Sequence, residues 1–340
     1  MRPPKQFARH GTRIGFLAVW AVGLAMPAGA KALYTSFDPP GSTYTYPAAI
    51  NGSGTIAGDY ADTAGVSHGF VRTSDGTIES FDPSGSTGTF ANGINRGGAV
   101  AGEYEANSNQ LHGFVRAAKG KITSFDPSGS VDTYAQTINR ADTVAGSYYD
   151  SANVPHGFLR HSDGTVTTFD PSESVATLVT SINDLGSVAG SYVDQGDEFH
   201  GFVRTADGAI TTFDVPGSGH TVPQSINTGG TIAGVYQDSA GAYHGFVRTS
   251  DGTITSFDPS GATSTIPYSI DDRNAVTGYF DTVHRKFSYR AFLRTADGTI
   301  KVFQYPRSPI TYALSINNNR EITGLYSDKI GTYHGFLRTQ

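Results

Sequence analysis

The chain of 340 residues contains no cysteine, so neither disulfide bonds nor thiol chemistry can contribute to its stability or activity. Its only tryptophan, Trp20, and both methionines lie within the first 26 residues. Stacking of a sugar on an indole ring is therefore excluded from the rest of the chain, although tyrosine offers a similar surface. The helical periodicity of 3.6 residues is also missing, which excludes the helical repeat folds.

Catalytic and metal-binding signatures are missing as well. The sequence has no Gly-x-Ser-x-Gly, no His-Glu-x-x-His, no phosphate-binding loop and no dinucleotide fingerprint. None of its loops has the Asp-x-Asp-x-Asp-Gly spacing of a calcium site, and we expect the following loop acids to be merely polar: Asp62, Asp150, Asp194, Asp238 and Asp328. We therefore predict no catalytic residue, no metal site and no cofactor.

Only one hydrophobic run stands out, and it lies at the N-terminus. Residues 14–26 are apolar, basic residues precede them, and small residues such as Ala28 and Ala30 follow. Thirteen residues are too few to cross about 30 Å of hydrocarbon as a helix. We predict that residues 1–32 are a cleaved signal peptide, and that residues 33–340 are exported to the periplasm or the extracellular space without membrane insertion.

Charge narrows the set of partners. The whole chain has a formal net charge of −6, and residues 1–32 hold five of its 24 basic residues and none of its 30 acidic ones. The mature chain therefore has 19 basic and 30 acidic residues, a formal charge of about −11. Because phosphate neutralisation needs a basic face, nucleic acid is not expected as a partner.

One unit recurs along the chain. Its core reads Ile-Asn-x-x-Gly-x-(Val/Ile)-Ala-Gly-x-Tyr, followed by His-Gly-Phe-(Val/Leu)-Arg, Asp-Gly-Thr-(Ile/Val) and Phe-Asp-Pro. The isoleucine of this core is spaced 44 residues apart five times and then 46, and it opens units 1 to 7 at Ile50, Ile94, Ile138, Ile182, Ile226, Ile270 and Ile316. Such a period, with four strand-like runs, predicts propeller blades of four antiparallel strands. In unit 1 we expect strands at residues 47–51, 55–60, 68–73 and 77–82, then a crossover at 83–90.

The two ends of the predicted mature chain complement each other. Residues 33–38 match the fourth strand alone, and the C-terminus stops after the third strand at residues 334–339. Together they complete a seventh blade, which predicts a single all-β, seven-bladed propeller over residues 33–340, closed by the N-terminal strand. Closure removes the exposed strand edges that an exported β-protein must avoid.

The repeat resembles that of bacterial extracellular proteins built from HAF-type repeats. The matching motifs include Gly93-Ile94-Asn95, Val100-Ala101-Gly102 and His112-Gly113-Phe114, and the resemblance covers residues 33–340. It implies export and repetition, without an assigned activity or catalytic residues.

A histidine opens the third strand of most units, and an aspartate closes the fourth. A three-residue turn at Ser-Asp-Gly would bring each pair together, whereas a two-residue turn would place them on opposite faces. We interpret the pairs as structural clamps rather than a metal or acid–base ring, because they recur in nearly every unit. The pairs are His68–Asp82, His112–Asp126, His156–Asp170, His200–Asp214, His244–Asp258 and, across the chain ends, His334–Asp38.

Two further repeated positions have structural explanations. The asparagine after the isoleucine fits an Asx-type turn between the first two strands. The arginine after His-Gly-Phe, seven times over, is expected to be solvated or stacked on an outer strand rather than to form a polyanion site.

Unit 6 departs from the repeat and carries the candidate binding residues. It has a two-residue insertion between its second and third strands, Arg290 replaces the clamp histidine, and Gln304 replaces the clamp aspartate. Positive residues gather there, which predicts an anion-binding patch if the change is more than loop drift. The patch consists of His284, Arg285, Lys286, Arg290 and Arg307.

We therefore expect an exported, monomeric, non-enzymatic binding or scaffold propeller, whose partner is an anionic polysaccharide or another protein. One alternative is a hydrolase or lyase with its site in the central funnel, where the loops after the second and fourth strands meet. The other is a structural envelope protein without a ligand. An enzyme should break the repeat with acid–base or metal-binding residues that converge on the axis.

Overall fold

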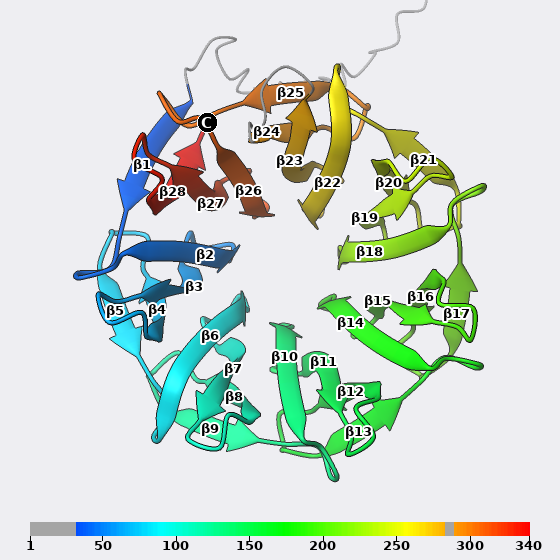
Figure 1. Cartoon of the computed structure of the whole chain (residues 1–340), viewed down its shortest axis with the longest axis horizontal. Coiled ribbons are helices and arrows are strands. Elements are labelled where there is room, and N and C mark those ends of the chain that lie inside the picture. Colours follow the sequence, from blue (N-terminus) through cyan, green and yellow to red (C-terminus); the bar gives the residue numbers. More distant parts are fainter. Residues whose placement is uncertain (1–31, 283–288) are drawn as a thin grey trace, which may run out of the picture. The chain divides into compact units, whose positions relative to one another are not determined.

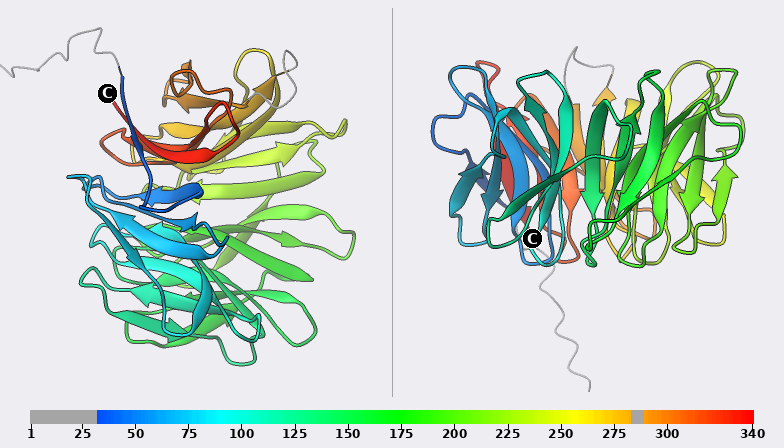
Figure 2. Two further views of the ribbon diagram at one scale, coloured as in Figure 1. Left: turned by 60° about the vertical axis from the view of Figure 1, so that its left-hand side comes forward. Right: turned by 90° about the horizontal axis from the view of Figure 1, so that it is seen from below.

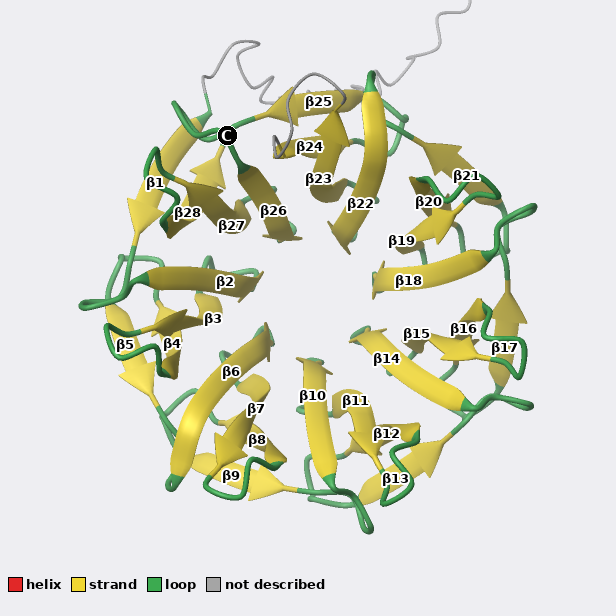
Figure 3. Cartoon of the chain, in the orientation of Figure 1, coloured by secondary structure: helices red, strands yellow, loops and turns green. Residues whose placement is uncertain are grey.

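The computed structural model describes residues 32–282 and 289–340, which form 28 β-strands joined by turns, with no helix (Figures 1 and 3). No stretch of these residues offers a helix of the length and hydropathy needed to span a membrane. The strands form four-stranded antiparallel sheets, one for each sequence unit. Two sheets are also joined by a single parallel bridge between Phe199 and His220.

The sheets stand around a central axis, with the first strand of each innermost and the fourth at the periphery (Figure 1). Seen from the side, the connecting loops gather at the two ends of the axis (Figure 2). The first strands are β2 (Tyr44–Ile50), β6 (Ser86–Ile94), β10 (Asp132–Ile138), β14 (Ala176–Ile182), β18 (His220–Ile226), β22 (Ala262–Ile270) and β26 (Thr311–Ile316). The second strands are β3 (Ile56–Ala61), β7 (Val100–Ala106), β11 (Val144–Tyr149), β15 (Val188–Val193), β19 (Ile232–Gln237), β23 (Val276–Thr282) and β27 (Ile322–Ser327).

The outer half of each sheet holds the third and fourth strands. The third strands are β4 (Ser67–Arg72), β8 (Leu111–Arg116), β12 (Pro155–Arg160), β16 (Phe199–Arg204), β20 (Tyr243–Arg248), β24 (Tyr289–Arg294) and β28 (Tyr333–Thr339). The fourth strands are β5 (Ile78–Phe81), β9 (Ile122–Phe125), β13 (Val166–Phe169), β17 (Ile210–Phe213), β21 (Ile254–Phe257), β25 (Ile300–Phe303) and, from the N-terminus, β1 (Leu33–Phe37). β1 pairs antiparallel with β28, from Leu33 opposite Thr339 to Phe37 opposite Gly335.

The first strands begin earlier than the sequence predicts. β2 starts at Tyr44 rather than at residue 47, and β6 starts at Ser86, inside the predicted crossover. The crossover is short because the Ser86 amide donates to the Pro83 carbonyl at 3.1 Å and turns the chain at once.

The turn between the third and fourth strands has the three-residue form. The Thr73 amide donates to the Thr77 carbonyl at 2.9 Å, and Gly76 lies between them at a φ of +96°. Glycine adopts this left-handed conformation without the steric cost that a side chain would add. The resulting register sets Gly69 opposite Phe81, which carries the clamp histidine to the clamp aspartate.

The core lies between neighbouring sheets and repeats around the axis. Phe114 is fully buried and packs edge-on against Phe81 of the preceding sheet, with ring centroids 5.8 Å apart. The Arg116 guanidinium lies over the same Phe81 ring at 5.0 Å. Gly69 makes room for that ring, because a Cβ there would lie 2.6 Å from it. An arginine is stacked in this way at all seven positions, and the prediction of stacking is confirmed.

Candidate functional site

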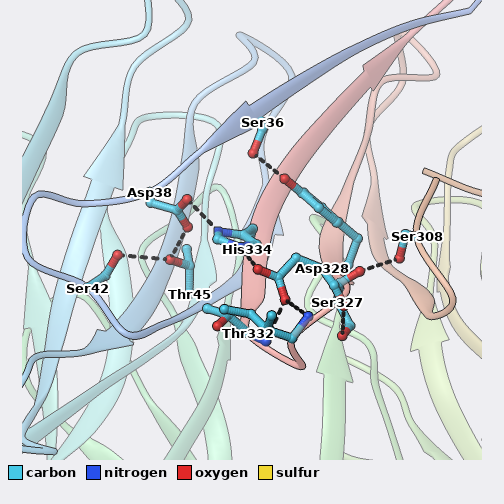
Figure 4. A network of polar contacts seen from close by, with 11 residues as sticks. Ser36, Asp38, Ser42, Thr45, Ser308, Ser327, Asp328, Thr332 and His334 are labelled. Carbon is cyan, nitrogen blue, oxygen red and sulfur yellow. Dashed lines mark hydrogen bonds and ion pairs between the residues drawn. The ribbon is translucent and has the colours of Figure 1, made fainter. Parts of the chain in front are cut away.

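The predicted clamps lie at the end of the axis that carries the loops between second and third strands. His68 Nδ1 lies 2.8 Å from Asp82 Oδ2, the pairing expected for a three-residue turn. The same contact, at 2.7 to 3.0 Å, joins His112 to Asp126, His156 to Asp170, His200 to Asp214, His244 to Asp258 and His334 to Asp38. Figure 4 shows the network around His334.

Five of the six clamps also reach the next sheet through their aspartate, the exception being Asp214, beside which Thr221 accepts the Val215 amide. Asp82 Oδ1 accepts a 2.6 Å hydrogen bond from Thr89 at the start of β6, and Asp38 accepts one from Thr45 of β2. The threonine was missed in the sequence reasoning, although it precedes the isoleucine by five residues in every unit. The clamp therefore fastens a hairpin and ties neighbouring sheets together.

The loop acids do more than the sequence analysis expected. Asp62 Oδ1 accepts the amides of Ala64 and Val66, and its Oδ2 lies 3.5 Å from His68 Nε2. The amide of Val66 holds the pKa of Asp62 below its usual value. Asp150, Asp194, Asp238 and Asp328 cap their own loops in the same way.

Two carboxylates beside one imidazole raise the pKa of the histidine. The hydrogen bond that His244 makes to the Asp258 carboxylate raises the pKa of His244 against the effect of burial, and Asp238 adds to it. Burial opposes the charged ring in His68, His156 and His200, but the paired carboxylates outweigh it and raise the pKa there too. These groups satisfy one another, and the described residues hold no cluster of three or more histidine or acidic side chains placed to bind a metal ion.

The opposite end of the axis carries a belt of asparagines. The side chain of Asn51 accepts the amides of Ser53 and Thr55, as the predicted Asx turn requires. Its Nδ2 also donates to the Asn95 carbonyl of the next sheet at 3.0 Å, a contact that the sequence did not indicate. Similar bonds run from units 2, 3, 4 and 5 to the following unit and from Asn317 to Asn51.

The belt is interrupted at unit 6, where Asp271 replaces asparagine. A carboxylate cannot donate, and Asp271 Oδ2 is buried without a hydrogen-bond partner among the described residues. Burial raises the pKa of Asp271. The belt surrounds a polar cavity of about 550 Å³.

A second cavity on the axis, of about 640 Å³, lies on the side of the clamps, and we name it the axial chamber. Its polar lining includes Asn92, Gln136, Gln224, Ser181, Ser225, Ser269 and Ser315, and its aromatic lining consists of Tyr46, Tyr134, Tyr149 and Tyr268. These side chains differ from unit to unit: the position of Gln136 holds Ala48, Asn92, Thr180, Gln224, Tyr268 and Leu314 elsewhere. The repeat is therefore broken where the sheets face the axis.

Six partly exposed tyrosines of units 6, 7 and 1 adjoin the chamber, and we name them the tyrosine arc: Tyr44, Tyr268, Tyr279, Tyr289, Tyr312 and Tyr333. Successive ring centroids along the arc lie 4.6 to 6.4 Å apart. Tyr268 belongs to both arc and chamber, and it lines the chamber together with Tyr46. Burial raises the pKa of Tyr279 to about 12, so its ring is neutral at physiological pH.

Two carboxyls break the repeat beside the chamber. Burial raises the pKa of Asp59 to about 7 and that of Glu103, helped by Asp59, to about 8. Glu103 accepts a 2.7 Å hydrogen bond from Asn92 Nδ2, and the backbone of Ala135 in the next sheet opposes the rise of its pKa. In unit 3, Ser147 at the same position accepts the Val179 amide of the next sheet. In unit 3 this position therefore supplies an acceptor for the neighbouring sheet, whereas in units 5 and 7 it holds Val235 and Leu325.

The sequence reasoning found the repeated clamps but missed the arc, the chamber and the two carboxyls. The only signal for them was departure from the repeat at positions facing the axis. Of the predicted anion-binding patch, His284, Arg285 and Lys286 lie outside the described residues. Arg290 and Arg307 are exposed, and Gln304 donates to the Ser308 carbonyl in place of a clamp.

Comparison with known proteins supports the fold alone. Neither the protein-family models nor the curated proteins include a match to the chain. Among solved structures, the β-propeller domain of the trilobed protease from Pyrococcus furiosus is 10% identical over 87% of this chain and 95% of its own, with a TM-score of 0.65. BP39L lectin from Burkholderia pseudomallei is 9% identical over 90% of this chain and 95% of its own, with a TM-score of 0.54.

TolB from Acinetobacter baumannii is 14% identical over 73% of this chain, which spans 62% of the TolB chain, with a TM-score of 0.52. Identities this low carry no information on ligand or activity. Together with the four-stranded sheets around an axis, the three likenesses show that the chain is an all-β protein with the β-propeller fold.

Proposed function

We propose that this chain is an exported, seven-bladed propeller of the HAF-type repeat family that binds a ligand in the axial chamber without transforming it. Closure through β1 is supported by its pairing with β28 and by the Asn317–Asn51 hydrogen bond between units 7 and 1. Export is supported by the signal pattern of residues 1–32, almost all of which lie outside the described residues.

The observation that carries the binding role is where the repeat is broken. The clamps, the stacked arginines and the asparagine belt are nearly the same in every unit, because every sheet needs them to pack. The chamber-facing positions vary between alanine, amides, threonine, tyrosine and leucine. A scaffold without a ligand gains nothing from such asymmetry, whereas a concave, partly aromatic cavity with converging polar groups is typical of ligand sites.

The test is a thermal-shift screen of the protein against cell-wall sugars, polyanions and metal salts. A ligand of the chamber should lose affinity in a Gln136→Ala, Gln224→Ala double variant. It should keep its affinity in Thr211→Ala, on the exposed face of β17. The proposal fails if every bound ligand is indifferent to the double variant.

The second candidate is a hydrolase or lyase, favoured by the pKa values of Asp59 and Glu103. Values of about 7 and 8 suit proton transfer near neutral pH. Burial alone also accounts for both values, without a catalytic role. Turnover of any chamber ligand that Asp59→Asn abolishes without weakening binding would establish an enzyme.

The unit 6 patch is a further proposal, supported by the exposure of Arg290 and Arg307. Changing Arg285, Lys286 and Arg290 together to serine should preserve folding and abolish retention on an acidic-polysaccharide column at low salt. Equal retention of parent and variant would leave loop drift as the explanation of unit 6.

A further inference from the structure

We propose that the tyrosine arc and the axial chamber together bind a neutral oligosaccharide, whose sugar rings stack on the arc and whose hydroxyls are bound in the chamber. This inference rests on the proposed binding function and names the chemical class of the ligand.

The arc offers an aromatic platform of unusual extent for a chain without tryptophan in its described part. Tyr279 and Tyr312 are 4.6 Å apart, Tyr289 and Tyr312 5.1 Å, and Tyr44 and Tyr333 5.7 Å. All six rings are partly exposed, so they do not form a closed core. A tyrosine ring combines an apolar face with a polar hydroxyl, which matches a sugar ring with its apolar C–H face and polar edge.

The chamber continues this platform with groups that recognise hydroxyls. Asn92, Gln136 and Gln224 each carry an amide that can both donate and accept. Serine hydroxyls also line the chamber. Ser225 Oγ accepts the amide of Ile270, and Ser315 Oγ accepts that of Ile50, which leaves the proton of each hydroxyl for a ligand.

The chamber serines retain a free hydrogen-bonding capacity. Ser181 and Ser269 accept amides of the next unit in the same way as Ser225 and Ser315. Within residues 32–282 and 289–340, none of these four hydroxyls is seen to donate in turn. Four O–H groups therefore remain to bind acceptors in the cavity.

Charge selects the neutral class. Every described side chain that lines the chamber is uncharged. Asp59 and Glu103 lie beside its wall, and burial raises the pKa of both, so that they are not fixed negative charges at neutral pH. No described base lines the chamber, so an anionic sugar would gain no countercharge there. The concave shape also suits an oligosaccharide better than the flatter surface of a protein partner.

The experiment is isothermal titration of the protein with hexaoses of neutral cello-, xylo-, manno- and N-acetylchito-series, and with hexagalacturonate as the acidic probe. We expect at least one neutral hexaose to bind, and we expect the affinity for hexagalacturonate to be no higher than the affinity for that hexaose. Tyr312→Ala should lower the affinity for the neutral hexaose about tenfold, whereas Tyr312→Phe should retain most of the affinity.

The chain offers a matched control for the arc. Tyr243 occupies the same repeat position as Tyr333, immediately before His-Gly-Phe, but lies outside the arc and is 43% exposed. Tyr333→Ala should lower the affinity for the neutral hexaose about fivefold, and Tyr243→Ala should leave this affinity unchanged. The melting temperatures of both variants show whether either change disturbs folding.

Three results would overturn the inference. The saccharide class is wrong if no neutral hexaose binds while the thermal-shift screen finds another ligand that responds to the chamber variant; the proposed binding function then survives. The arc is not the platform if Tyr243→Ala and Tyr333→Ala weaken binding equally. Binding of hexagalacturonate alone, lost on Arg290→Ser, would assign recognition to the unit 6 patch.

Discussion

The molecule has a uniform region, where the same contacts recur in nearly every unit, and an irregular region, where the units differ. Tyrosines are found in both. In the uniform region, a tyrosine of the second strand packs on a clamp histidine with ring centroids 5.0 to 5.4 Å apart, at Tyr60, Tyr104, Tyr148, Tyr192, Tyr236 and Tyr326. In the irregular region, the tyrosine arc comes from units 6, 7 and 1 alone. The same side chain thus serves packing where it repeats, and it is available to a ligand where it does not.

The largest effect is expected where the uniform region is joined through the chain ends. Deleting residues 33–38 removes the pairing of β1 with β28 and the buried Phe37, which packs on Phe70 and under Arg72. Four or five hydrogen bonds at about 1 kcal/mol each and about 2 kcal/mol for the ring predict a loss of roughly 6 kcal/mol. Chemical denaturation measures it, and a deletion variant as stable as the parent contradicts closure through β1.

A smaller loss is expected at a single clamp. His156→Ala leaves the carboxylates of Asp150 and Asp170 without their shared partner and should cost about 1–3 kcal/mol. Affinity for a chamber ligand should not change, because the clamp lies in the uniform region. A variant that keeps its stability but loses the ligand would assign the histidine to the site.

These expectations show how much could be read from the sequence. The Ser-Asp-Gly repeat predicted a turn but left its length open, and the register of the clamp follows from the three-residue form that the structure shows at Gly76. The asparagine belt could only be half predicted, because an Asx turn is local whereas the bond from Asn51 to Asn95 depends on how two sheets approach each other.

The arc was beyond sequence reasoning for a different reason. Tyr44, Tyr279 and Tyr333 come from the first, second and third strands of different units, and no shared motif connects them. Only packing of the sheets around the axis brings them together. Repeats reveal what every unit needs, so a site made of exceptions becomes visible only in three dimensions.

The pH dependence of stability sharpens the comparison within the uniform region. His68, His156, His200 and His244 have a raised pKa in the folded state. Their contribution is complete below about pH 6.5 and is lost as the pH rises through the folded pKa. Asp59 and Glu103, with pKa values raised to about 7 and about 8, act in the same direction, but their contribution begins to be lost above about pH 4.

The aspartates of the loops between second and third strands set the acidic limit of the stability range. Asp62, Asp150, Asp194 and Asp238 have a lowered pKa, so their contribution is complete above about pH 3.9 and is lost as the pH falls further. Stability should therefore be greatest near about pH 4 to 4.5 and should fall as the pH rises towards 8. Melting curves from pH 3 to 9 measure this, and a melting temperature that rises from pH 6 to 8 contradicts it.

The smallest effect is expected at the interruption of the belt. Asp271→Asn supplies a donor from unit 6 to the Asn317 carbonyl, which already accepts the Arg320 amide of its own turn, and should stabilise the protein by about 1 kcal/mol. Asp272→Asn is the matched control, because Asp272 already accepts the amide of Thr228 and Nδ2 of Asn318. Equal effects of the two changes on chemical denaturation would mean that the belt adds nothing at this position.

The central claim is that the irregular tyrosines bind the ligand while the uniform ones hold the sheets together. Fluorine NMR of the protein labelled with 3-fluorotyrosine reports both sets in one spectrum, with single Tyr→Phe variants assigning the signals. On titration with a neutral hexaose that binds, the resonances of Tyr279, Tyr312 and Tyr333 should shift, and those of Tyr148 and Tyr192 should stay in place. Shifts confined to the histidine-stacked tyrosines, or spread equally over both sets, would contradict the account.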